Sequence, residues 1–135
     1  MKASTLSFQV AVLFVLIGMA WGIQMAISQN HAAMPAHAHL NLLGWVSLFL
    51  MGIYYRLHPA LDGARSAFVQ VWTWILGTVV LTAGVGMLHS GVESGEPLAA
   101  VGSFIALFGM LLFGWQVVRV GRVENAGELA ASPAE

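Results

Sequence analysis

Histidines are the side chains of this sequence best suited to chemistry. The chain has five histidines and no cysteine, and His31, His37 and His39 lie close together in the first third. Neutral imidazole is the commonest metal ligand in proteins. The missing thiols exclude disulfides, iron–sulfur clusters and cysteine nucleophiles. The candidate chemistry is therefore binding of copper, zinc or heme iron.

The composition defines where these histidines must work. Of 135 residues, 59% are hydrophobic and 8% are charged, whereas a soluble globular domain carries about 25% charged residues. Five Lys/Arg against six Asp/Glu leave no basic stripe, so a nucleic-acid partner is excluded. The composition predicts an integral membrane protein with the lipid bilayer as its main surroundings.

Four apolar stretches are long enough to cross a bilayer, at about residues 5–28, 39–57, 67–89 and 97–120. A helix needs about 20 residues to span the hydrocarbon core, and backbone groups in lipid must be hydrogen-bonded within the element. The short connections make neighbouring helices antiparallel. We therefore expect an all-α, up-down-up-down four-helix bundle over residues 1–120, with a flexible cytoplasmic tail at 121–135.

The basic residues predict the orientation of the four spans. All five fall on one side of the predicted topology, namely Lys2, Arg56, Arg65, Arg119 and Arg122. The two connections on the opposite side carry no basic residue. Cytoplasmic loops are enriched in Lys and Arg. We expect a multi-pass protein of a bacterial inner membrane with both termini in the cytoplasm.

This topology brings four histidines to the outer boundary of the membrane, namely His31, His37, His39 and His89. Ionisable residues at membrane depth are costly and are usually functional, although an interfacial histidine can also simply lie among lipid headgroups. His37 and His39 are separated by about 200° on a helix, so they cannot face the same point. The sequence leaves open which of them faces inward.

Glycine pairs recur in three of the predicted spans. Small residues allow helices to approach closely, or leave room for a flat ligand. In the third and fourth spans, the glycines could serve helix packing or leave room for a porphyrin. In the first span, they could form the contact between copies in a homo-oligomer. The pairs are Gly18/Gly22, Gly77/Gly84 and Gly102/Gly109.

The run His37-Ala-His39-Leu-Asn41-Leu-Leu-Gly44-Trp-Val46 resembles the second transmembrane helix of the catalytic subunit of heme-copper oxidases, most closely in the nitric-oxide-reductase branch. The resemblance implies that His39 is an axial ligand of heme b, with Asn41 and Gly44 in the same motif. The family's copper-binding histidine pair, active-site tyrosine and outer arginines have no counterpart. The resemblance therefore implies a heme site, without a complete oxidase or reductase active site.

His89 is the predicted second axial ligand, because it ends the third span at the depth at which His39 begins the second. Gly84 would leave room for the heme between them. Such a protein would transfer electrons with a respiratory partner, or bind a small gas such as nitric oxide or oxygen. Two alternatives remain open: copper or zinc held by His31, His37, His39 and His89, as in an oxidase assembly factor, or a purely structural accessory subunit.

Overall fold

The computed structural model describes the backbone of residues 1–131 and the side chains of residues 1–122. The described part contains helices and no strand. In chain order these are α1 (Ala3–Ser28), α2 (Met34–His39), the π-helix η1 (Leu40–Ser47), α3 (Leu48–Leu57), α4 (Pro59–Asp62), α5 (Arg65–His89) and α6 (Gly95–Ala131).

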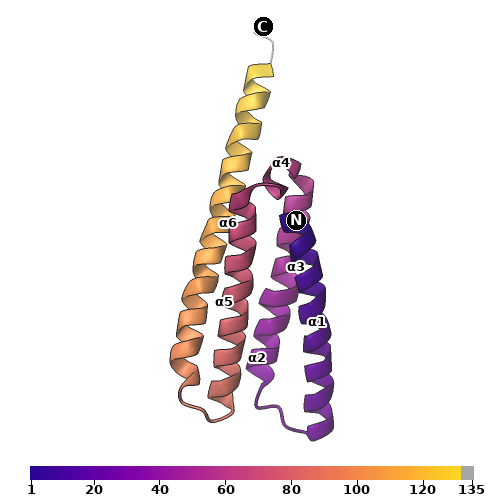
Figure 1. The fold of residues 1–135 in the computed structure, drawn as a ribbon, viewed down its shortest axis with the longest axis vertical. Helices are drawn as coiled ribbons and strands as arrows, with labels where there is room; N and C mark the ends of the chain where they lie inside the picture. Colours follow the sequence, from indigo (N-terminus) through magenta and orange to yellow (C-terminus); the bar gives the residue numbers. More distant parts are fainter. Residues whose placement is uncertain (132–135) are drawn as a thin grey trace.

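Four helical stretches are long and apolar enough to cross a membrane: Ala3–Ser28, Met34–Leu57, Arg65–His89 and Gly95–Arg122. The second stretch is continuous through α2, η1 and α3, and we call it the second span. The four stretches run antiparallel to their neighbours in the chain (Figure 1). This confirms the predicted all-α membrane bundle.

Two boundaries differ from those expected. The second span begins at Met34, five residues before the expected start at His39, with Pro35 in its first turn. Proline suits this position because its missing N–H would have no partner within the helix. At the other end, α6 continues as helix to Ala131, and the flexibility of the tail at 121–135 stays a prediction. Residues 132–135 of that segment lie outside the described residues.

The spans lie in the order α6, α5, second span, α1 (Figure 1). The third span, α5, packs along α6 and also contacts the second span, whereas α1 packs against η1 and α3. Helices α2, η1 and α5 are therefore the elements that position the candidate site at the end of the bundle opposite α4.

The glycines of α5 and α6 bring these two helices into backbone contact. A Cβ atom added at Gly77 would lie 2.5 Å from the Ala106 backbone nitrogen, and one at Gly84 would overlap the backbone of Ala99. Gly102 packs in the same way against Leu81. Gly84 thus faces α6 and serves helix packing, and its role beside a porphyrin stays a prediction.

A polar cluster joins three spans near the α4 end. The Tyr55 hydroxyl lies 2.6 Å from Gln70 Oε1 and 3.0 Å from Gln116 Oε1. The Gln70 amide donates to the Gly109 carbonyl at 3.1 Å, and the Gln116 amide donates to the Ser66 carbonyl at 3.0 Å. Tyr55 and both glutamines are buried. Because buried polar groups are costly when unpaired, this cluster fixes the relative positions of α3, α5 and α6.

Asp62 caps the amino end of α1 from a distant part of the chain. Its carboxylate accepts from the Ser4 backbone N–H at 2.7 Å and from the Ser4 hydroxyl at 2.9 Å. Only 2% of Asp62 is exposed. A carboxylate at this position satisfies a backbone donor that lacks a helical partner and complements the positive end of the helix dipole.

We expect Asp62→Ala to lower the free energy of unfolding by about 1–2 kcal/mol, the usual cost of losing a helix cap. Thermal unfolding in detergent, monitored by circular dichroism, measures the change. Glu93→Ala is the control, because Glu93 is an exposed acidic residue in the connection at the opposite end. Equal stability of the two variants would contradict a capping role for Asp62.

All five basic residues lie at the α4 end of the bundle, as predicted, at the ends of the spans. We therefore expect a reporter fused after Glu135 to be cytoplasmic and one inserted at Glu93 to be periplasmic. Activity of paired phosphatase and fluorescent-protein fusions measures both sides. The reverse pattern would contradict the proposed orientation.

Candidate heme-binding site

His37 and Asn41 point at α1. A Cβ atom added at Gly22 would lie 3.2 Å from His37 Cε1, and one at Gly18 would lie 2.6 Å from Asn41 Oδ1. The Asn41 amide also donates to the His37 carbonyl at 2.8 Å. The Gly18/Gly22 pair therefore contacts two polar side chains of the same chain, and association of copies stays a prediction.

Gly44 also belongs to the contact with α1. A Cβ atom added there would lie 2.6 Å from Phe14 Cδ2. Within the motif, His37, Asn41 and Gly44 thus form one surface packed on α1. A role for Asn41 and Gly44 in holding a cofactor remains a proposal, and their described contacts are with this neighbouring helix.

His39 lies on a different side of the second span, about 200° around the helix from His37. It is half-buried, and its Nδ1 atom lies 2.7 Å from the Pro35 carbonyl oxygen. A carbonyl can only accept, so the neutral ring donates from Nδ1 and keeps the lone pair of Nε2 for another partner. This is the tautomer that a metal-ligating histidine needs.

The second span continues from His39 as an exposed apolar stripe, formed by Leu42, Val46 and Leu50. These side chains are 60%, 38% and 60% exposed, so Leu42 and Leu50 are largely uncovered and Val46 is partly covered by the described chain. The π-helix η1 begins directly after His39, and π-helical turns are frequent at functional sites. No residue pattern in the sequence indicated this change in helix geometry.

His89 has the same tautomer preference but a different depth. Its Nδ1 atom lies 2.9 Å from the Val85 carbonyl oxygen. One turn before it, Gly86 packs on the Ala36 side chain, which would lie 3.5 Å from a Cβ atom at Gly86.

The contact between Ala36 and Gly86 fixes the register of the two helices. His39 follows Ala36 by three residues, and His89 follows Gly86 by three residues. Because the two helices are antiparallel, the two histidines are displaced from this contact in opposite directions. At a rise of about 1.5 Å per residue, His39 and His89 are about 9 Å apart along the bundle axis. The expected equal depth is wrong, because the second span begins at Met34 instead of His39.

The four outer histidines do not form one metal centre in the described part of the chain. His31 lies exposed in the connection before α2, and no group of three His, Cys, Asp or Glu side chains among the described residues is arranged to hold a metal ion. A zinc site in a protein normally takes three or four protein ligands. The copper or zinc alternative therefore has no preformed site within the described residues.

Part of this sequence is similar to known proteins. The chain is 31% identical over 133 residues to a cytochrome c oxidase subunit 1 of Thermus thermophilus. This chain is similar to part of that oxidase subunit. The match covers 79% of the chain and 24% of the subunit.

A second cytochrome c oxidase subunit 1 from Thermus thermophilus is 33% identical over 66 residues, covering 44% of the chain and 61% of that subunit. No family model and no solved structure matches. Similarity to subunit 1 of the oxidases is thus found over part of their length. The nitric-oxide-reductase branch stays a prediction.

Proposed function

We propose that this chain is a heme-binding membrane protein in which His39 is an axial ligand of a b-type heme. The hydrogen bond between His39 Nδ1 and the Pro35 carbonyl carries the proposal, because it orients the ring and keeps Nε2 for iron. The similarity to part of oxidase subunit 1, a family that carries heme, supports the same cofactor.

The surroundings of His39 suit a porphyrin. The macrocycle is flat and largely apolar, and the stripe of Leu42, Val46 and Leu50 offers exposed apolar surface. Lipid, another subunit or a second copy would cover the remaining side of the heme. We therefore place the proposed heme on the outside of the four spans, in place of the interior position expected from the sequence.

The second axial position decides what the heme does. Heme iron with two protein ligands transfers electrons, whereas an open position binds a small gas. His89, about 9 Å away along the axis by the register described above, would need a rearrangement of the outer end of α5 to reach the same iron. The geometry therefore favours His39 as the single ligand from this chain, with the sixth position open or filled by a partner.

The absorption spectrum of the purified protein, expressed with a heme precursor, tests the proposal. We expect a Soret band, α and β bands after reduction, and a shift of the reduced Soret band with carbon monoxide. A colourless protein with stoichiometric copper or zinc would overturn the proposal in favour of the metal alternative. A colourless, metal-free protein would overturn the proposal in favour of a purely structural accessory subunit.

A further inference from the structure

The exposed apolar stripe of the second span has His39 at its outer end. From Leu42, Val46 and Leu50 it continues to Ile53, which is 39% exposed. These four side chains contain no polar atom, so another molecule can pack on them without burying an unpaired polar group. The inference developed from this surface rests on the proposed function, because it concerns the same heme.

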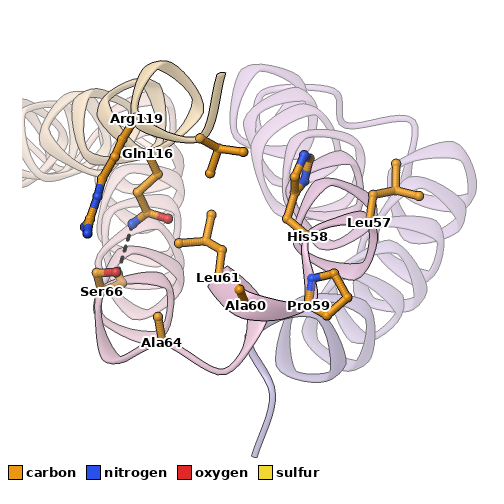
Figure 2. Close-up of a pocket in the computed structure, with 10 residues that line it drawn as sticks. Leu57, His58, Pro59, Ala60, Leu61, Ala64, Ser66, Gln116 and Arg119 are labelled. Atoms are coloured by element: carbon orange, nitrogen blue, oxygen red, sulfur yellow. Dashed lines mark hydrogen bonds between the residues drawn. The ribbon is translucent and has the colours of Figure 1, made fainter. Parts of the chain in front are cut away.

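Neither of two pockets near the ends of the bundle can hold a heme at His39. A pocket of about 430 Å³ lies at the α4 end, where Leu57 and Leu61 line it (Figure 2). A pocket at the outer end, lined by Ser28 and Ser90 among others, measures about 140 Å³, whereas ligand sites usually enclose about 300–1,000 Å³. The stripe therefore remains the surface for the heme, which leaves the far side of the macrocycle to a second molecule.

The other described histidines are poorly placed to complete the coordination of the iron from within one chain. His37 packs on α1, and His89 is displaced by about 9 Å along the bundle axis. His31 lies in the exposed connection before α2, and His58 ends α3 at the opposite end of the bundle. A second copy of the chain is a source of a second imidazole that has the same tautomer as His39.

Symmetry gives that second imidazole the correct depth. Copies inserted in one membrane with the same orientation can be related by a two-fold axis only when the axis is parallel to the membrane normal. Rotation about this axis leaves every atom at its own depth. His39 of one copy and His39 of a second copy are therefore at equal depth, the condition that His39 and His89 of one chain do not meet.

Charge does not oppose the approach of two copies along the stripe. All five basic residues lie at the α4 end. Among the described side chains, the acidic residues are Asp62 in α4, Glu93 in the outer connection and Glu96 in the first turn of α6. The stripe itself is thus free of charge, and two identical stripes can face each other without like-charge repulsion.

We propose that two copies of this chain bind one b-type heme between them, with His39 of each copy as an axial ligand. The iron lies on the two-fold axis, and the two stripes cover opposite faces of the macrocycle. Apolar surface gains little by leaving lipid for another helix, so the two iron–histidine bonds are the main link between the copies.

Heme content, mass and spectrum of the full chain, purified in detergent after expression with a heme precursor, test the proposal together. We expect one heme per two chains by the pyridine hemochrome assay and the mass of two chains by analytical ultracentrifugation. Electron paramagnetic resonance of the oxidised protein should show low-spin iron with two imidazole ligands, because both axial positions are filled.

Carbon monoxide provides an independent readout of the same link. It should displace one His39 from the reduced iron, so the shift of the Soret band should accompany separation of the two chains. Since carbon monoxide and the second chain compete for one position, the gas concentration at half-conversion should rise about tenfold for a tenfold rise in protein concentration. A half-conversion that is independent of protein concentration would contradict the shared heme.

Two variants, co-expressed with a differently tagged parent chain, complete the test. His89→Ala should pair with the parent chain and keep the low-spin heme, whereas His39→Ala should not be recovered with the parent chain. Circular dichroism must show the same helical content in both variants. One heme per chain, at any mass, would overturn the shared heme and leave the proposed function intact. A parent chain without heme would overturn the proposed function itself.

Discussion

The His39→Ala variant should lose its heme, with heme content falling by at least roughly tenfold after expression in excess heme precursor. The reason is that it removes the imidazole that contacts the Pro35 carbonyl through Nδ1 and lies at the start of the exposed apolar stripe. Loss of a partner that merely orients a ligand already costs roughly 10–100-fold in metal affinity, and loss of the ligand itself should cost more. The pyridine hemochrome assay measures the heme per protein.

Three further histidine variants make this result specific. We expect His37→Ala to keep heme, because His37 packs against Gly22 of α1. We expect His89→Ala to keep it as well, because of the offset along the bundle axis. His58→Ala, at the α4 end, is the control for general destabilisation. Heme retained by His39→Ala but lost by His37→Ala would transfer the ligand role to His37.

The second large effect is expected at Gly102. An added Cβ atom there would overlap the backbone and Cβ of Leu81, so Gly102→Ala must push α5 and α6 apart. Overpacking of a close contact typically costs about 1–3 kcal/mol. We expect a loss of this size in the free energy of unfolding, measured by titration with sodium dodecyl sulfate in mixed micelles.

Gly114→Ala provides the matched control in the same helix. No heavy atom lies within 4 Å of a Cβ atom added at Gly114, and alanine is favoured over glycine in a helix by about 1 kcal/mol. This variant should therefore be as stable as the parent chain or slightly more stable. Equal stability of Gly102→Ala and Gly114→Ala would contradict the tight α5–α6 contact.

The sequence predicted the features that depend on the bilayer. Hydrophobic length identified four spans, because every backbone group in lipid must be paired within its helix. It also placed Lys2, Arg65 and Arg119 at one end of the bundle. These features follow from composition along the chain and do not require knowledge of which side chains meet.

Features that depend on side-chain partners were not predictable in the same way. The glycine spacing indicated close packing, but it did not show that Gly18 and Gly22 would admit Asn41 and His37. The depth of His39 was not predictable, because a proline can occupy the first turn of a helix, as Pro35 does here.

The polar cluster and the cap on α1 were missed, although the sequence contained a signal for the cluster. Gln70 and Gln116 are polar residues within apolar spans, and such residues usually have partners inside the bundle. Asp62 follows the second span in a turn-forming segment, where acidic residues are common. Only the folded chain shows that its carboxylate meets Ser4.

The polar cluster also has a consequence for biogenesis. Helices α5 and α6 form a glycine-packed hairpin, and α1 with the second span forms another. Each hairpin contains local contacts that can form as it leaves the translocon. Tyr55 is in the first hairpin and Gln70 and Gln116 are in the second, so the glutamines lack this partner until both hairpins meet in the membrane. Two halves of the chain, divided near Gly63 and co-expressed, should therefore assemble. The hydrogen bonds of the Tyr55 hydroxyl with the two glutamines would contribute to this association.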